Sequence, residues 1–170
     1  MVKPYQDSPH SKKEQVRAMF DSIAHSYDFL NHFLSFNTDR SWRRKLVRMA
    51  GKTWTEEELG KLDILDLATG TGDLAFSLEK LGPGNVTGLD LSEKMLEIAK
   101  EKALKRRSEV QFTPGDAEKL PFADGQFDLV TVAFGVRNYQ DLEAGLREMH
   151  RVLRKGGWFY ILEFSRPGKG

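Results

Sequence analysis

A predicted strand gives way to a predicted helix at the stretch Asp66-Leu67-Ala68-Thr69-Gly70-Thr71-Gly72-Asp73. Apolar residues of strand type occupy 61–67, and the helical pattern begins at Leu74. The glycines therefore fall at a sharp turn, where a backbone without Cβ atoms can adopt unusual angles and lie against a ligand. The helix that begins there also offers free N–H groups and the positive end of its dipole.

The next predicted strand ends in an acid, Asp90. A carboxylate in this place can accept hydrogen bonds from both hydroxyls of a ribose. The glycine turn and Asp90 together therefore predict an adenosine site. A turn that serves only to reverse the chain is the alternative, and Asp90 disfavours it because it adds a second element at the distance that an adenosine site requires.

Two classes of cofactor fit this site. The letters from Gly70 to Ala75 match the dinucleotide pattern G-x-G-x-x-G/A, whose glycines and helix end hold a pyrophosphate. The other class is S-adenosylmethionine, which carries an ammonium group in place of phosphates. Asp66 and Asp73 bracket the loop and would repel a pyrophosphate, whereas either could pair with an ammonium. The acids therefore favour S-adenosylmethionine, and a nicotinamide or flavin cofactor remains open.

Composition bounds the class of protein. The 170 residues suffice for one domain with a hydrophobic core. With 26 basic and 25 acidic residues the net charge is +1, which provides no global field for nucleic acid. The absence of cysteine excludes disulfides and thiolate chemistry, and the four histidines lack metal-site spacing, so we predict no metal. Because no apolar run could span a bilayer and residues 1–7 lack a signal-peptide core, we expect a cytoplasmic protein, soluble or bound at a membrane surface.

The chain divides into a helical lead-in and an alternating core. Apolar residues at helical spacing across 16–34 predict one or two amphipathic helices, and Thr38 or Asp39 is expected to cap a further helix. We therefore assign residues 1–50 to an N-terminal helical segment and residues 51–170 to a Rossmann-like core, within one domain. Predicted strands at 62–68, 85–91, 109–113, 127–134 and 157–164 alternate with predicted helices at 73–81, 93–106 and 141–154.

This alternation predicts an α/β fold, with a parallel sheet covered by helices on both faces. Ligands of such sheets bind at the carboxyl ends of the strands. The segment 113–122 follows the third predicted strand and places Asp116 and Ala117 there. The Asp116 carboxylate could accept from the exocyclic amine of adenine while the Ala117 N–H meets a ring nitrogen. A capped turn is the alternative, which the ligand-like segments after three consecutive strands disfavour.

Further segments carry a family resemblance. Phe127-Asp128-Leu129-Val130 is similar to the fourth-strand segment of class I S-adenosylmethionine methyltransferases. Over about residues 14–167 the chain resembles, more narrowly, the ubiquinone/menaquinone biosynthesis C-methyltransferase family. The segments that carry the narrower match are Tyr27-Asp28-Phe29-Leu30-Asn31-His32-Phe33-Leu34-Ser35 with Trp42, Phe134-Gly135-Val136-Arg137-Asn138, Arg151-Val152-Leu153-Arg154-Lys155-Gly156-Gly157, and Leu162-Glu163-Phe164-Ser165.

The resemblance implies a fold and a reaction. The fold is that of class I methyltransferases, a Rossmann-like parallel sheet with helices on both faces. The reaction is transfer of a methyl group from S-adenosylmethionine to a ring carbon of a prenylated quinol, a demethylmenaquinol or a related benzoquinol, without a metal. Another class I methyltransferase, a cofactor-binding fragment without catalysis and an NAD-dependent oxidoreductase remain the alternatives. The predicted cofactor residues are Asp66, Gly70, Thr71, Gly72, Asp90, Asp116 and Ala117.

Arg137 and Asn138 are the predicted catalytic residues, because they directly follow the fourth predicted strand, where the methyl group is expected. A quinol ring carbon becomes nucleophilic when an adjacent hydroxyl loses its proton. We expect Arg137 to stabilise the resulting quinolate and Asn138 to orient it, since arginine stays protonated and is a poor base. The alternative is an ion pair between Arg137 and Asp141, with Asn138 as a helix cap.

The helical lead-in is expected to form the substrate side. Its aromatic residues could line a tunnel for a polyprenyl tail, and its basic cluster could contact anionic lipid at a membrane surface. A core-facing stripe and a solvated basic face are the alternatives. The aromatic residues are Tyr27, Phe29, Phe33 and Phe36, and the basic cluster is Arg40, Arg43, Arg44, Lys45 and Arg48.

The last predicted strand is strongly apolar and runs Trp158-Phe159-Tyr160-Ile161-Leu162-Glu163-Phe164. The class I fold normally continues past this strand into a helix and a hairpin that pairs beside it, whereas this sequence stops at Gly170. An uncovered apolar edge invites pairing with another chain. We therefore expect either a chain that lacks the usual C-terminal hairpin or a homodimer through this edge.

Overall fold

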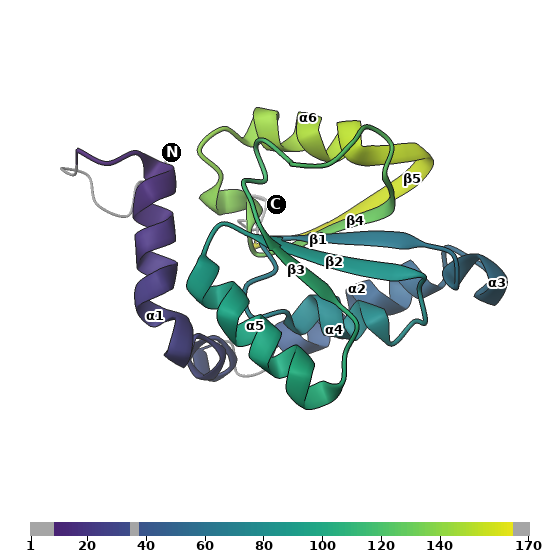
Figure 1. The fold of residues 1–170 in the computed structure, drawn as a ribbon, viewed down its shortest axis with the longest axis horizontal. Coiled ribbons are helices and arrows are strands. Elements are labelled where there is room, and N and C mark those ends of the chain that lie inside the picture. The colour runs from purple at the N-terminus through teal and green to yellow at the C-terminus, as the bar shows by residue number, and fades with distance from the viewer. Residues whose placement is uncertain (1–8, 35–37, 165–170) are drawn as a thin grey trace, which may run out of the picture.

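The computed structural model describes residues 9–34 and 38–164, except for the side chains of 28–34. The strands are β1 (Asp63–Leu67), β2 (Asn85–Asp90), β3 (Gln111–Pro114), β4 (Phe127–Ala133) and β5 (Leu153–Leu162). They form one sheet in the order β3-β2-β1-β4-β5, and every neighbouring pair is parallel (Figure 1). The predicted α/β fold is therefore confirmed.

Helices cover both faces of this sheet. They are α1 (Lys12–Leu34), α2 (Thr38–Gly51), α3 (Glu56–Leu59), α4 (Asp73–Glu79), α5 (Glu93–Arg106) and α6 (Leu142–Val152), with one 3-10 turn, η1 (Val136–Asn138). α2, α4 and α5 lie on one face and α6 lies on the other (Figure 1). α1 stands across the carboxyl ends of the strands and contacts α5, α2 and η1. These ends are where ligands of parallel sheets bind.

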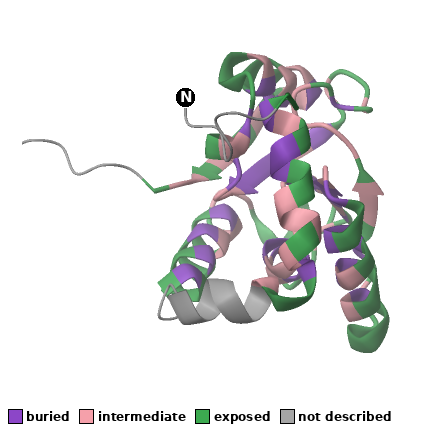
Figure 2. Ribbon diagram, turned by 90° about the vertical axis from the view of Figure 1, so that its left-hand side faces the viewer, coloured by how far each residue is buried: buried purple, intermediate pink, exposed green. Residues whose placement is uncertain are grey.

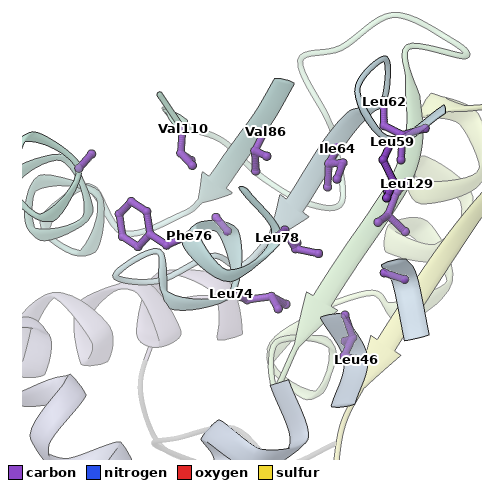
Figure 3. Close-up of a cluster of buried hydrophobic side chains, with 13 residues drawn as sticks. Leu46, Leu59, Leu62, Ile64, Leu74, Phe76, Leu78, Val86, Val110 and Leu129 are labelled. Atoms are coloured by element: carbon purple, nitrogen blue, oxygen red, sulfur yellow. The ribbon is translucent and has the colours of Figure 1, made fainter. Parts of the chain in front are cut away.

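The central strand β1 is buried on both faces, and the middle of the sheet is buried while the outer faces of the helices are exposed (Figure 2). Ile64 packs with Leu74 of α4 in one cluster (Figure 3), and Leu65 packs with Met149 of α6 in the other. A strand in this position needs a nearly continuous apolar run. Asp66 interrupts that run although only 1% of its surface is exposed. Packing does not explain a buried carboxylate, so Asp66 points to function.

β5 begins at Leu153, earlier than the expected start at residue 157. Leu153 pairs with Phe127 of β4, and the register shifts before Leu129 pairs. Gly156 lies in this irregular stretch with φ +85°. A pair of glycines after a helix indicates a loop, whereas pairing with β4 draws these residues into an irregular strand.

Two local features differ from the expected ones. α3 was not predicted, although Thr55 and Glu58 form a capping box in which each side chain bonds the other residue's backbone N–H. The caps expected for α2 are wrong, because α2 begins at Thr38 and both Thr38 and Asp39 lie in its first turn. The Asp39 carboxylate instead pairs with Arg43 at 2.8 Å.

β5 lies at the edge of the sheet and exposes apolar side chains. The exposed fractions are 52% for Trp158, 51% for Phe159 and 39% for Ile161. Unpaired strand edges of this kind can pair with another chain. A homodimer through this edge therefore stays a prediction.

Candidate active site

The turn after β1 adopts a conformation that requires glycine. Gly70 has φ +57° and Gly72 has φ +87°, both in the left-handed region that disfavours side chains. A Cβ atom on Gly72 would lie 2.8 Å from Phe112 Cζ and 2.8 Å from Phe76 Cε2. The backbone therefore lies close against β3 and α4, and a substitution there would have to displace two aromatic rings.

The backbone N–H groups of both glycines are already bonded, one to the end of β2 and one within the turn. Gly70 N donates to Asp90 Oδ2 at 2.7 Å, and Gly72 N donates to the carbonyl oxygen of Thr69 at 2.9 Å. A dinucleotide loop keeps such groups for the pyrophosphate. The geometry of the turn therefore disfavours a dinucleotide, for a reason that the spacing of the glycines does not reveal.

Asp90 joins the end of β2 to the glycine turn. Its Oδ2 accepts from Gly70 N, and its Oδ1 accepts from Ser92 N at 2.8 Å. Burial raises the pKa of Asp90, while these backbone N–H groups lower it. Each carboxylate oxygen has a second lone pair, so Asp90 can accept ribose hydroxyls without giving up these bonds.

Asp66 is held from two sides by hydroxyl groups. Thr69 Oγ1 donates to Asp66 Oδ2 at 2.7 Å, and Thr131 Oγ1 of β4 donates to Asp66 Oδ1 at 2.7 Å. Burial raises the pKa of Asp66 to about 6, against these two hydrogen bonds, which lower it. A cationic ligand beside Asp66 would favour its ionised form. Asp66 can therefore serve as an acceptor for an ammonium group.

The other acid of the turn, Asp73, is engaged by two cations. Arg43 Nη1 lies 3.3 Å from its Oδ2, and Lys102 Nζ lies 3.0 Å from its Oδ1. Lys102 also donates to Oγ1 of the buried Thr71 at 2.9 Å. Asp73 thus ties α2 and α5 to the turn, and Asp66 remains as the acid available to an ammonium.

Asp116 lies after β3, as expected, and is bonded on both oxygens. Its Oδ1 accepts from Glu118 N at 2.9 Å, and its Oδ2 accepts from Lys13 Nζ of α1 at 2.6 Å. Lys13 also pairs with Glu118 at 3.2 Å. Asp116 therefore stabilises the turn that it begins and does not cap a helix. Lys13 of α1 contacts the same carboxylate that is expected to accept from the exocyclic amine of adenine.

Two clefts meet at the glycine turn. The larger, with about 530 Å³ of open space, is lined by Asp90, Asp116 and Ala117, among others. The smaller, with about 380 Å³, is lined by Asp66 and the turn itself. Ala68 lines both clefts. Because the two clefts share this residue, one molecule could place a nucleoside in the first cleft and an amino-acid part in the second.

The two predicted catalytic residues both lie in η1, and their side chains have different neighbours. Asn138 lines the larger cleft. The Arg137 guanidinium lies 5.2 Å from the centre of the Phe164 ring and its Nη1 lies 3.6 Å from Glu163 Oε1. Asp141 caps α6 by accepting from Ala144 N at 3.0 Å. Both structural alternatives are therefore wrong, because Arg137 pairs with Glu163 and Asn138 is not the cap.

An aromatic cluster connects Arg137 to the smaller cleft. Phe134 lines that cleft, stacks on Phe164 at 4.9 Å and lies 6.2 Å from Trp42 of α2. Tyr27 also lines this cleft, whereas the side chains of the other aromatic residues expected in a tunnel lie outside the described residues. These others are Phe29, Phe33 and Phe36.

Sequence reasoning missed three residues of the site: Thr131, Lys13 and Tyr139. Thr131 is a polar residue in a buried apolar strand, which is a usable indication. Lys13 and Tyr139 carry no such indication, because they come together with the segment after β3 only in the folded chain. Among the described residues, no group of three or more His, Asp or Glu side chains could hold a metal ion.

The buried Asp66 should make folding stability depend on pH. A folded pKa of about 6 against an unfolded value of 3.8 means that the folded chain binds the proton more tightly. This contribution is fully present below about pH 4 and is lost as the pH rises through about 6. We expect the free energy of unfolding, measured by urea titration relative to Asp66→Asn, to fall by about 2 kcal/mol from about pH 4 to about pH 7.

Asp63 supplies a control of opposite sign. Burial raises its pKa, but hydrogen bonds from Asn85 and Arg154 lower it overall. Its contribution is therefore present above the unfolded pKa and is lost as the pH falls through the folded one. Relative to Asp63→Asn, the unaltered chain should gain stability with rising pH. If the difference in the free energy of unfolding between the unaltered chain and Asp66→Asn does not change with pH, the pKa of Asp66 is not raised in the folded chain.

Comparison with known proteins identifies a family and similar relatives. The sequence matches the ubiE/COQ5 methyltransferase family over residues 8–169. A demethylmenaquinone methyltransferase of Bacteroides fragilis is 44% identical over 171 residues, which cover 99% of this chain and 67% of the relative. The ubiquinone/menaquinone biosynthesis C-methyltransferase UbiE of Geotalea uraniireducens is 47% identical over 162 residues, with 92% and 66% covered. The chain thus spans about two thirds of the length of these relatives.

Solved structures give the same fold. A SAM dependent methyltransferase from Aquifex aeolicus superposes with a TM-score of 0.59 at 25% identity. The match covers 66% of this chain and 62% of that chain.

Proposed function

The chain belongs to the ubiE/COQ5 methyltransferase family, and we propose that it binds S-adenosylmethionine and transfers the methyl group to a ring carbon of a prenylated quinol. The names of the relatives from Bacteroides fragilis and Geotalea uraniireducens support this reaction class. The observation that best supports this cofactor is the hydrogen bond from Gly70 N to Asp90, beside the buried Asp66. Two carboxylates suited to a ribose and to an ammonium thus lie on neighbouring strands, which supports the proposal.

The described residues fit S-adenosylmethionine better than a dinucleotide. We assign the ribose to Asp90, the adenine to Asp116 and Ala117, and the ammonium to Asp66. The glycine N–H groups that would hold a pyrophosphate are already bonded. An ammonium needs acceptors instead, and carboxylates supply them. The cofactor would therefore span both clefts across Ala68.

The chemistry asks little of the protein beyond alignment and charge. The cofactor supplies an electrophilic methyl group on a sulfonium that leaves as a neutral thioether. With the proton of the adjacent hydroxyl lost to water, a bond would form between the quinol ring carbon and the methyl carbon as the carbon–sulfur bond breaks, and the ring carbon would then give its own proton to water. Arg137 stabilises the negative charge on the quinol oxygen, and Asn138 orients the ring. The ring would lie on the aromatic cluster of Phe134, Phe164 and Trp42.

Calorimetry separates the candidate cofactors. We expect S-adenosylmethionine and S-adenosylhomocysteine to bind and NAD to give no heat of binding. Binding of NAD alone would favour the oxidoreductase and overturn the proposal. Methylation of a demethylmenaquinol analogue and of a benzoquinol analogue then identifies the acceptor, measured on this chain and on a chain extended to the length of the relatives. Cofactor binding without turnover in both would support a fragment without catalysis.

The substrate of such an enzyme is a lipid, so we infer that the protein works in the cytoplasm at a membrane surface. Within the described residues, no helix is long and apolar enough to cross a bilayer. An open groove between α2, α4 and α5 is lined by Arg40, Arg44, Lys80 and Arg106, among others. Arg43 is buried in ion pairs and cannot contribute a free charge. The groove is the surface that we assign to anionic lipid headgroups.

Charge reversal in this groove should release the protein from anionic vesicles. Each basic residue near a membrane contributes about 1 kcal/mol, so Arg40→Glu with Arg44→Glu should reduce binding to phosphatidylglycerol vesicles at least about 10-fold. Cosedimentation at low salt measures the bound fraction. Lys119→Glu with Lys155→Glu is the matched control, because both lysines are exposed and do not line the groove. Equal losses in both pairs would point to net charge and sink the assignment.

A further inference from the structure

The hydroxyl group of Tyr139 is buried without a partner. Tyr139 follows η1 and exposes 7% of its surface, and its Oη makes no hydrogen bond within the described part of the chain. A buried polar group left unbonded costs about 1–3 kcal/mol. Such a group in a native fold calls for an explanation, and a ligand that completes the bond is one.

Tyr139 lies at the wall of the larger cleft. It lines this cleft together with Asp90, Asp116 and Ala117. Burial raises the pKa of the Tyr139 phenol, and the carboxylates of Glu118, Asp66, Asp116 and Asp90 raise it further. Asp66, Asp90 and Asp116 belong to or follow β1, β2 and β3. The cleft is also lined by Ala68 and Gly115, which follow β1 and β3, so Tyr139 lies where the carboxyl ends of these strands meet.

The ring of Tyr139 is fixed before any ligand binds. A Cβ atom on Gly145 of α6 would lie 2.5 Å from Tyr139 Cδ2, so the ring packs directly on this glycine. Lys12 Nζ of α1 donates to the Tyr139 carbonyl at 2.6 Å and to the Arg137 carbonyl at 2.9 Å. The side chain is thus held by α6 and the backbone by α1. A donor that is ordered in advance loses little entropy when it binds.

The wall of this cleft carries three carboxylates, and its side-chain donors besides Tyr139 are Lys13, Ser92, which donates to Asp21, and Asn138, which we assign to the quinol. The carboxylates of Asp90, Asp116 and Glu118 can only accept, and Lys13 is committed to Asp116 and Glu118. An adenine ring presents one amine donor and three nitrogen acceptors. The amine matches Asp116, and the Ala117 N–H matches one nitrogen. A second nitrogen needs another donor, and a phenol that stays protonated is one.

We propose that Tyr139 recognises the adenine of the cofactor by donating a hydrogen bond from its hydroxyl group to a ring nitrogen. The inference rests on the proposed cofactor and adds a residue to its site. It also explains why the hydroxyl is kept although it has no partner in the chain. Recognition by a neutral donor would help to distinguish adenine from a ring that presents N–H or C–H at the same position.

Tyr139→Phe tests the proposal because it removes the hydroxyl and keeps the ring. We expect the affinity for S-adenosylhomocysteine, measured by calorimetry, to fall about 10-fold, since one ring nitrogen is left unpaired. Without ligand, the free energy of unfolding should stay the same or rise, because an unbonded polar group has been removed from the interior. A residue with a purely structural role would show the opposite pattern.

Deaza analogues of S-adenosylhomocysteine, with carbon in place of adenine N1, N3 or N7, identify the bond. For one analogue the unaltered chain should lose about 10-fold in affinity and Tyr139→Phe should lose nothing further. Tyr160→Phe is the control, because the Tyr160 hydroxyl bonds to Thr53 Oγ1 at 2.9 Å and lies outside the cleft. It should leave cofactor affinity unchanged.

Three results would count against the inference. An unchanged affinity of Tyr139→Phe for S-adenosylhomocysteine would overturn it. An affinity of this variant that falls equally for all three deaza analogues, relative to S-adenosylhomocysteine, would overturn it as well. In both cases the unaltered chain still binds S-adenosylhomocysteine, so the proposed function would stand. Absence of binding by the unaltered chain would instead overturn the proposed function and the inference together.

Discussion

Replacement of Asp90 by Ala is expected to weaken the binding of S-adenosylmethionine at least about 100-fold, because hydrogen bonds to a charged group contribute about 1.5–3 kcal/mol each. The variant loses the carboxylate that we assign to both ribose hydroxyls. It also releases Gly70 N and Ser92 N, which Asp90 holds at 2.7 and 2.8 Å. The glycine turn would then lose its tie to β2, so the ligand and the loop that cradles it are affected together.

Calorimetry with S-adenosylmethionine measures the loss of affinity, and two further variants serve as an intermediate case and a control. Asp90→Asn keeps one oxygen acceptor without the charge and should lose an intermediate amount. Asp124→Ala removes an exposed acid that pairs with Arg151 and lines neither cleft, so the affinity should not change. If Asp90→Ala still folds and its affinity for S-adenosylmethionine stays within threefold of that of the unaltered chain, the assignment of the ribose to Asp90 is wrong.

The juxtaposition of Asp90 and the glycine turn was predictable because it depends on local order. A strand, a helix and a second parallel strand joined by a right-handed crossover bring the two strand ends together. β1 and β2 are indeed neighbours, with Leu67 opposite Leu89. The sequence therefore determined this half of the site through connectivity alone.

The partners of Asp73 and Asp66 were not predictable in the same way. Arg43 precedes Asp73 by 30 residues and Lys102 follows it by 29, and both reach it through helix packing. Thr131 bonds Asp66 because β4 pairs with β1 across 65 residues of sequence. Spacing within one loop contains no information on such contacts, which is why two equivalent acids were expected where one is already neutralised.

The placement of Arg137 shows the same limit. Its position after β4 was predictable, but its partner depends on β5, whose register shifts beside β4. Glu163, directly after β5, comes within 3.6 Å of the Arg137 guanidinium. The arginine therefore lies beside Phe164 with one carboxylate, and about half of its side chain is exposed.

Arg137→Ala is expected to lower kcat for methyl transfer about 100- to 1,000-fold, the range found when a group that stabilises developing negative charge is removed. The affinity for S-adenosylmethionine should stay within about twofold, because Arg137 does not line the cofactor clefts. Arg137→Lys keeps the charge and should recover part of the rate, although it loses the planar contact with Phe164. Turnover of a demethylmenaquinol analogue at saturating cofactor measures kcat.

Ionisation of a bound quinol analogue tests the same role without turnover. A guanidinium beside the quinol oxygen should lower the pKa of the bound hydroxyl, so its absorbance change should occur at lower pH on the unaltered chain than on Arg137→Ala. Asn138→Ala serves as the comparison, because loss of an orienting amide should reduce kcat with a smaller effect on this pKa. Identical titrations on the unaltered chain and Arg137→Ala would remove Arg137 from charge stabilisation and leave it as a partner of Glu163 alone.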